Sequence, residues 1–517
     1  MQEKLRLTSP IGKVLPRSLV WAMACICASC DNQADFPAGD VHSEAGFEAS
    51  SKENVYNDDL DTLRMLMTSS DSQAKWRGVT RVRLAGRGSL ELIALCKEML
   101  LKDNDKFLRK EAADALVSFG AQAIPTLMEA LAVGDAVSQK YAIRALGRFG
   151  EKGVIAVPRI AALLRSPGLT SCCAIALGRI GTPALAALPE IKKAVENAGE
   201  DPSVLFSLEY AMLVLQPEQP ESRQRAIDLL RDPRVQESAR SDIEAMGARL
   251  AVIPVLVKAL EYEGCGESAA GVLGEMPECL PVALPALLIA LKSRGTDIRA
   301  SVARALGKIG KSQAAVARAL GEAMEDPDGG VRSEVADSLR GLGSAKRAAI
   351  PSLLKSLDNS DHDIRFDGMS VIGEVVAGEP QVVDKVGSIL ADASNSGALR
   401  AAAARSLRES GKQGLSYLLG VLETTGDRDE DEDAVREACI ECMLAFGGEP
   451  RAVMALARVV QEGTRTLQSA AISVLGQLGP DAKAAIPALD SVRGALESEA
   501  SRAIRRIRGL TLAPDAR

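Results

Sequence analysis

Apolar residues recur along most of this chain with the spacing of an α-helix. In the segment 123–131 they occupy positions i, i+3, i+4 and i+7, which fall on one helix face; they are Ile124, Leu127, Met128 and Leu131. After a polar loop, the segment 142–149 repeats the same spacing. The pattern therefore predicts pairs of short amphipathic helices joined by polar loops.

This two-helix pattern repeats. Seven segments carry a proline near the beginning of the first helix, where a missing amide proton costs nothing; they contain Pro125, Pro158, Pro189, Pro254, Pro285, Pro351 and Pro487. Their separations are about 33 residues or multiples of it, the length of a helical repeat. Glycine follows the second helix in several units, where a left-handed residue can end it; examples are Gly150, Gly181, Gly310 and Gly479. We expect the inner glycines of ALGRFG (145–150) and ALGKIG (305–310) to let neighbouring helices approach closely.

A short helix pair cannot bury its apolar faces alone, so successive pairs must stack. With the repeated segments above, this pattern resembles the HEAT-repeat family, and more narrowly its PBS-lyase HEAT-like form. The resemblance covers residues 58–510 and implies an all-α fold: a right-handed α-solenoid, or α–α superhelix, of about 14 two-helix units. It also implies that the loop Asp and second-helix Arg of a unit set the stacking of neighbouring repeats; such pairs are Asp103 with Arg109, Asp326 with Arg332, and Asp361 with Arg365.

One place departs from the pattern. Pro217 and Pro220 interrupt the helical spacing, and the unit after them lacks the leading proline. Proline cannot sit within a helix without bending it. The sequence therefore predicts a bend or hinge at residues 216–222.

The first 57 residues differ from the repeats. Residues 1–30 carry a charge of +3 and contain the uncharged run 18–29, which has the length of a signal-peptide core. The run ends in Cys27-Ala28-Ser29-Cys30, which resembles the bacterial lipoprotein box, and this makes Cys30 a candidate lipidation site. Cleavage after Ala24 is the alternative. Residues 31–57 are acidic and aperiodic, as a tether would be, and residues 511–517 form a C-terminal tail.

These features predict an exported protein on the periplasmic side of a membrane, anchored through Cys30. The alternative is a cytoplasmic protein whose N-terminal segment is not processed. The cysteines do not decide between these compartments, because those beyond residue 30 are odd in number and have no disulfide spacing.

Composition limits the function. The formal net charge is −7, but residues 31–58 alone carry −6, so the repeats are nearly neutral. A surface that binds phosphate backbones without specificity needs excess Lys and Arg, and this balance does not supply it. The chain contains 2 His and no His-Glu dipeptide, which argues against the di-iron sites found on some HEAT-like scaffolds. We predict no cofactor and no nucleic-acid partner.

Three local motifs have a structural and a functional interpretation. Cys439 and Cys442 form a CxxC, but no second CxxC or suitable His accompanies them, which favours buried thiols over zinc. The acidic run 427–433 lacks the glycine and glutamate of a calcium loop, so we expect a solvated insertion. His362 lies in a repeat loop and is expected to be a surface residue.

The function that the sequence favours is a non-enzymatic, monomeric scaffold that binds a partner protein through the concave face, lined by the second helices. Six basic residues are candidates for that face: Lys140, Arg144, Arg304, Arg340, Arg405 and Arg436. Two alternatives stay open. One is a bilin-lyase-like enzyme or enzyme subunit, and the other is a nucleic-acid-binding HEAT protein.

Overall fold

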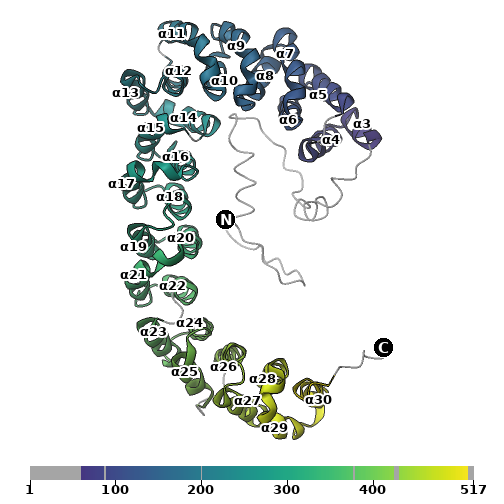
Figure 1. Cartoon of the computed structure of the whole chain (residues 1–517), viewed down its shortest axis with the longest axis vertical. Coiled ribbons are helices and arrows are strands. Elements are labelled where there is room, and N and C mark those ends of the chain that lie inside the picture. The colour runs from purple at the N-terminus through teal and green to yellow at the C-terminus, as the bar shows by residue number, and fades with distance from the viewer. Residues whose placement is uncertain are drawn as a thin grey trace, which may run out of the picture. The chain divides into compact units, whose positions relative to one another are not determined.

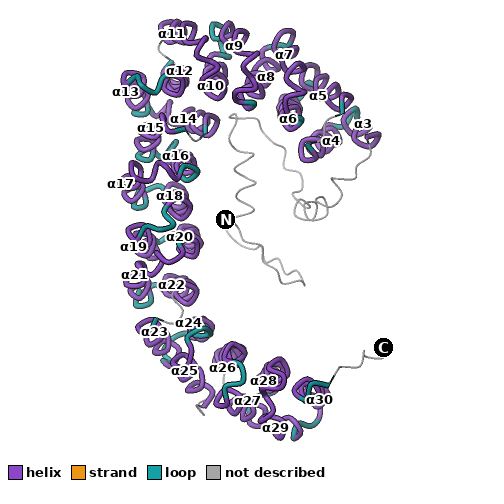
Figure 2. Tube along the Cα trace, viewed as in Figure 1, coloured by secondary structure: helices purple, strands orange, loops and turns teal. Residues whose placement is uncertain are grey.

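The computed structural model describes residues 60–86, 89–199, 201–247, 249–375, 379–423 and 430–510. Within these ranges every regular element is a helix, and Figure 2 shows no strand in the part of the chain that it colours. Cys30, the tether, the tail and the first part of the acidic run lie outside the described residues. The prediction of an all-α fold is confirmed.

The chain divides into two compact units, Met1–Val255 and Leu256–Arg517. The helices of unit 1 are α3 (Leu60–Met67), α4 (Ser72–Ala85), α5 (Leu90–Lys102), α6 (Lys106–Ser118), α7 (Ile124–Val133), α8 (Ala136–Arg148), α9 (Val157–Leu163), α10 (Thr170–Ile180), α11 (Leu188–Asn197), α12 (Pro202–Leu215), α13 (Pro220–Leu229) and α14 (Pro233–Met246). Helix α15 (Ile253–Ala259) contains the boundary.

The remaining helices belong to unit 2. They are α16 (Gly266–Leu273), α17 (Leu280–Ala290), α18 (Thr296–Ile309), α19 (Ala314–Glu322), α20 (Gly329–Gly341), α21 (Ile350–Ser356), α22 (His362–Val375), α23 (Pro380–Ala391), α24 (Gly397–Ser406), α25 (Gly411–Glu423), α26 (Glu430–Cys442), α27 (Pro450–Glu462), α28 (Arg465–Leu478), α29 (Ile486–Asp490) and α30 (Glu497–Ile507). Odd-numbered helices are the first and even-numbered helices the second of each pair.

Each unit is built of two layers. Second helices pack on second helices, as α18 does on α16 and α20, and first helices pack on first helices, as α21 does on α19 and α23. In Figure 1 the second helices of unit 2, α16 to α30, follow the inner side of that unit's arc. The pairs run from α3–α4 to α29–α30. This is an α-solenoid of HEAT-like repeats. It contains about 14 two-helix repeats, as the period predicts.

Local sequence fixes the helix ends. Aspartates cap many second helices: Asp135, for example, accepts a hydrogen bond from the backbone amide of Ser138 at the start of α8. The inner glycines permit close packing, as predicted. A Cβ at Gly147 would lie 2.8 Å from the Cα of Ala176, and one at Gly307 would lie 2.9 Å from the Cα of Ser338. Larger residues at these positions would force neighbouring second helices apart.

An arginine near the start of the second helix links several consecutive two-helix repeats. Arg299 donates to the carbonyl oxygens of Ser293 and Arg294, both at 3.1 Å, and forms a two-pronged ion pair with Asp326 of the next unit at 2.7 and 2.9 Å. Arg332 repeats the arrangement with the carbonyl of Asp326 and, at 2.6 Å, the carboxylate of Asp367. We call this contact the arginine staple. A planar guanidinium fits it because it can donate in several directions at once.

The staple corrects one detail of the predicted Asp–Arg pairs. For Asp103–Arg109 and Asp326–Arg332 the role in repeat stacking is confirmed, but the arginine takes the backbone carbonyl of its own loop Asp and the carboxylate of the following repeat. The third pair, Asp361–Arg365, makes its contacts within its own repeat. Arg109 donates to the carbonyl of Asp103 and pairs with Asp135 at 2.7 Å. Arg365 donates to the carbonyls of Asn359 and Ser360. The side chain of Asp361 caps α22 instead, accepting from the amide of Asp363 at 2.8 Å.

The carboxylates at the described end of the acidic run also make contacts between neighbouring repeats. Glu432 pairs with Arg400 at 2.6 Å, and Asp433 accepts a hydrogen bond from the hydroxyl of Thr464 at 2.9 Å. The prediction of a solvated insertion is therefore wrong for these two carboxylates, which hold neighbouring repeats together. Asp427 and Asp429 lie outside the described residues.

Unit 1 contains one irregular region. Helix α14 packs against α12 and also reaches α10 beyond it, so α12 is enclosed on every side. The sequence of α12 is largely apolar, and the run from Phe206 to Leu213 is buried. Pro220 begins α13, within the predicted bend at 216–222. The division between the units falls at Val255, beyond that bend.

Among the described helices, none is by itself both long and apolar enough to cross a membrane. One pair, Gly266–Leu273 with Pro277–Ala290, reaches that length and composition only together and is bent by 104°.

The staple can be tested at Asp326. Because Arg299 and Asp326 are 11% and 8% exposed, D326A leaves a buried guanidinium without its partner. We expect a loss of about 3 kcal/mol in the free energy of unfolding, measured by urea titration of the helical circular dichroism signal.

The matched control is K292A, which removes an ion pair with Glu322 whose side chains are 71% and 58% exposed. It should cost less than about 1 kcal/mol. Equal losses in the two variants would show that the buried staple has no special role.

Candidate functional site

A row of charges crosses the second helices of unit 2. Each member pairs with a carboxylate of the neighbouring repeat: Lys308 with Glu275, directly after α16, at 2.5 Å, Arg304 with Glu334 at 2.7 Å, and Arg340 with Glu374. We call these pairs the charge row. Because every cation in it faces a carboxylate, the row from α16 to α22 is largely neutralised by its own members.

The charge row decides how two of the predicted face residues are used, and burial decides a third. Arg304 and Arg340 are exposed as predicted, but their guanidinium groups are already engaged by Glu334 and Glu374. Arg436 is only 7% exposed and lies 3.7 Å from Glu432. Its side chain therefore belongs to the packing between repeats and is not available at the surface.

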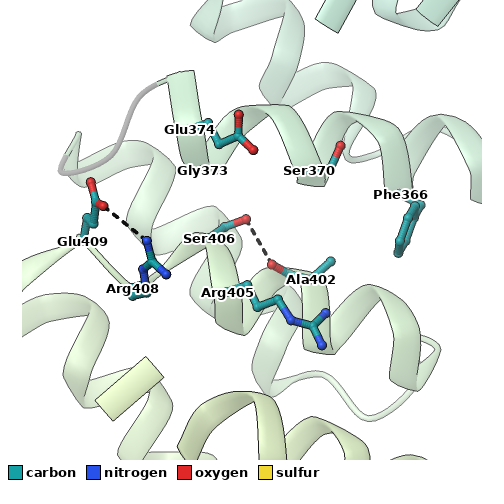
Figure 3. A pocket seen from close by; sticks show the side chains of 9 residues that line it. All are labelled: Phe366, Ser370, Gly373, Glu374, Ala402, Arg405, Ser406, Arg408 and Glu409. Carbon is teal, nitrogen blue, oxygen red and sulfur yellow. Dashed lines mark hydrogen bonds and ion pairs between the residues drawn. The ribbon is translucent and has the colours of Figure 1, made fainter. Parts of the chain in front are cut away.

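The charge row ends at a cavity of about 380 Å³ between α22 and α24. Figure 3 shows that Phe366 and Ser370 reach it from α22, and Arg405 and Ser406 from α24. Phe366 is 38% exposed, so its ring presents apolar surface at the cavity. The cavity thus joins an apolar wall to hydroxyl groups and a cation.

Arg405 differs from the arginines of the charge row. It is exposed, and it has no hydrogen bond or ion pair with any of the described residues. The carboxylates beside it have other partners: Glu374 is bound by Arg340, and Glu409 lies 3.7 Å from Arg408. Arg405 is therefore able to bind an acidic group from another molecule, next to the ring of Phe366.

In unit 1, Lys140 and Arg144 lie on α8 and are half-buried. Both have interactions within the chain. They lie close enough to Cys172 to influence its thiol: a hydrogen bond with Cys173 chiefly lowers the pKa of Cys172, and the charges of Lys140 and Arg144 add to this effect.

A buried carboxylate lies beneath this region, at a position that the sequence did not single out. Asp242 on α14 is 4% exposed and accepts a hydrogen bond of 2.5 Å from the hydroxyl of Ser207 on α12. Burial raises the pKa of Asp242 to about 7, although the hydrogen bond from Ser207 and the charge of Arg144 act in the opposite direction. The nearby hydroxyl of Tyr210 is buried without a partner among the described residues.

The other candidate motifs are structural. Cys439 and Cys442 are buried free thiols, and the Cys442 thiol lies 3.4 Å from the carbonyl oxygen of Ala404, which confirms the buried interpretation. Burial raises the pKa of Cys442 to about 11, which makes a thiolate ligand unfavourable. His362 is exposed, and its Nε2 lies 2.8 Å from the hydroxyl of Ser396. Over the described ranges, no three His, Cys, Asp or Glu side chains gather as metal ligands would.

Two family models match parts of the sequence. One describes HEAT repeats and covers residues 284–373, and the other describes the PBS lyase HEAT-like repeat and covers residues 108–132. No curated protein matches the sequence.

Among solved structures, Kap121p bound to RanGTP matches at 13% identity with a TM-score of 0.40. The match covers 96% of this chain and 57% of that one, so this chain spans little more than half the length of Kap121p. Yeast importin-β (Kap95p) matches at 12% identity with a TM-score of 0.37, covering 88% of this chain and 73% of that one. Likenesses this distant carry no information on function.

Asp242 gives a prediction for pH dependence. Because its folded-state pKa is raised to about 7, the folded chain holds a proton that the unfolded chain releases near pH 4. The free energy of unfolding should therefore fall as the pH rises from about 4 to about 7. D242N should lack this component, which is measured as the difference between wild-type and variant urea midpoints across that range.

Asp228 on α13 supplies the control, because its side chain is 46% exposed. The variant D228N should keep the wild-type pH dependence. If D242N and wild type instead lose stability in parallel, Asp242 is ionised in the folded protein across this range.

Proposed function

Because the chain is a HEAT-repeat protein, we propose that it is a non-enzymatic scaffold that binds a partner protein through the face formed by its second helices. The binding site that we propose is the cavity between α22 and α24. A partner that fits it presents an acidic side chain to Arg405 and an apolar side chain to Phe366. Arginine beside an exposed aromatic ring is the composition typical of protein-binding hot spots.

The observation that supports this site is the interruption of the charge row. The cations of that row are matched by carboxylates of the neighbouring repeat, as Arg304 is by Glu334 at 2.7 Å. Such exposed pairs keep the face soluble and add little to stability. Arg405 is on the same layer without a carboxylate, so a partner can supply one without breaking an existing ion pair.

The proposal predicts that R405E abolishes binding. Reversing the charge places a carboxylate opposite the partner's acidic group, and like charges at an interface cost several kcal/mol. The tagged chain would be purified from its native host, and the proteins retained by wild type and variant compared by mass spectrometry.

The control is R318E on α19, an exposed position in the first-helix layer of the same unit. The partner should be retained by wild type and R318E and lost with R405E. Retention of every bound protein by R405E would remove this site from the proposal.

We further propose that the chain is exported and anchored through Cys30, on the basis of the basic segment, the uncharged run 18–29 and the lipobox-like Cys27–Cys30. Replacing Cys30 by Ala removes the thiol that would be acylated. We expect C30A to lose acyl labelling and to move from the membrane to the soluble fraction. The same fractionation pattern in C30A and wild type would contradict the anchor.

A further inference from the structure

The last described helix of unit 2 carries a cluster of arginines. Helix α30 (Figure 1) packs against α28 and α29, and no described pair follows it. Four exposed arginines lie on this helix or directly after it, and we call them the terminal arginine cluster: Arg502, Arg505, Arg506 and Arg508. The segment 500–510 contains no aspartate or glutamate, so it is basic throughout.

Helical spacing places the cluster on the solvent side of α30. Arg502, Arg505 and Arg506 stand at positions i, i+3 and i+4, so they share one side of the helix. The opposite side belongs to the core, since Ile504 and Ile507 are buried. Burial of that side holds the helix in place, and the arginines stay accessible to another molecule.

The elements packed against α30 do not neutralise the cluster. Helix α28 has Arg465 as its only charged residue, so it offers no carboxylate. Asp481 and Asp490 belong to the turn and the helix that also contact α30, but neither forms an ion pair with the cluster. Within α30 itself, Glu499 accepts a hydrogen bond of 2.9 Å from the hydroxyl of Ser469. In the described ranges none of the four arginines has an ion-pair partner.

The helix dipole explains only part of this arrangement. The acidic residues of α30, Glu497 and Glu499, lie in its first turn, and Arg505 and Arg506 lie in its last turn, as the dipole favours. That effect is limited to the terminal turns of a helix. Arg502 lies outside the last turn, and it is also exposed without an acidic partner. The cluster is therefore larger than the stability of the helix requires.

We propose that the terminal arginine cluster binds the phosphate headgroups of an anionic membrane surface. A guanidinium group forms two parallel hydrogen bonds with a phosphate, and each basic residue near an anionic leaflet strengthens the binding. From Arg502 to Arg508 the cluster extends roughly 9 Å along the helix axis, so several headgroups of a flat surface reach it at once. Leu510 follows the cluster, is 56% exposed, and can enter the interface between headgroups and acyl chains.

Two other acidic ligands fit the cluster less well. Single-stranded nucleic acid stacks its bases on aromatic side chains as well as binding through its phosphates, and residues 447–510 contain no aromatic residue. An acidic protein segment binds most strongly where arginine adjoins an aromatic or apolar pocket. Among the large apolar side chains of the described residues 455–510, only Leu510 is exposed. A membrane surface needs neither a ring nor a pocket.

This inference does not depend on the other proposals. The cluster shares no residue with the cavity at Arg405, and its ligand is a lipid surface instead of a protein. It also does not require acylation of Cys30, because the cluster binds headgroups directly. Failure of any one of these proposals leaves the others standing.

The test is co-sedimentation of the chain with lipid vesicles. The chain would begin at residue 31, which retains every described helix and removes the basic segment 1–30 as a second source of binding. Vesicles of equal parts phosphatidylcholine and phosphatidylglycerol would be compared with vesicles of phosphatidylcholine alone. We expect binding to the anionic vesicles only. This binding should fall steeply when the salt concentration is raised, because exposed charges are then screened.

The variant R502Q/R505Q/R506Q removes three positive charges from the cluster. It should weaken binding to the anionic vesicles about 100-fold, because each basic residue near the surface adds to the binding energy. R502Q alone leaves the last turn of α30 intact and should weaken binding about fivefold. The single variant keeps the test decisive even where the triple variant is less stable.

The matched control is K311Q/R318Q/K412Q, which changes the net charge equally at exposed positions that lie apart in the sequence. This control should bind the anionic vesicles as wild type does. Equal binding by wild type, the control and the cluster variants would overturn the proposal. Equal binding of wild type to neutral and anionic vesicles would overturn it as well.

Two further measurements separate lipid binding from a structural role and from other ligands. The thermal midpoint of R502Q, followed by circular dichroism, should stay close to that of wild type, which shows that its weaker binding is not caused by unfolding. Poly-L-glutamate and single-stranded DNA, added at the same concentration of negative charge as the lipid, should displace little of the bound chain. Complete displacement by either polymer would assign the cluster to that class of ligand and overturn the choice of a membrane.

Discussion

Burial of each helix pair against the next is the interaction on which the rest of this structure depends. A pair such as α19–α20 presents apolar residues on two sides, and the neighbouring pairs cover both. The close approach of the second helices and the arginine staple both depend on this contact between neighbouring pairs. Glycines such as Gly147 allow the second helices to approach closely, and the arginine staple at Arg299 and Asp326 fixes how one unit is rotated on the next. Stability in such an array comes from interfaces between neighbours more than from any single unit.

Stacking also determines which charges remain available. Residues on neighbouring second helices lie side by side, so a cation on one unit is paired by an acid on the next, as Lys308 is by Glu275. A solenoid whose charges are matched in this way has a long surface but few charged side chains that lack an ion-pair partner. The exception is therefore informative: Arg405 lacks a carboxylate at the cavity between α22 and α24. This place is suited to an acidic and apolar protein segment.

The repeat period was enough to predict the fold, because the spacing of residues such as Ile124 and Leu127 depends only on helix geometry. It could not predict which surface arginines are free. Arg405 and Arg436 both follow the pattern of second-helix cations, yet one is exposed and the other is buried beside Glu432. That difference depends on how neighbouring repeats pack on each helix, and no local motif encodes it. Asp242 was missed for a similar reason: it meets Ser207 only because α14 packs across α12.

The dependence of each pair on its neighbours can be measured directly by comparing two fragments. Residues 314–341, which contain α19 and α20, would be examined by far-ultraviolet circular dichroism beside residues 256–510, which contain the described repeats of unit 2. Since an isolated short helix pair leaves its apolar faces in water, we expect little helix and no cooperative thermal transition for the single pair. The longer fragment should be helical and should melt cooperatively. A single pair that folds and melts as cooperatively as the longer fragment would contradict the account.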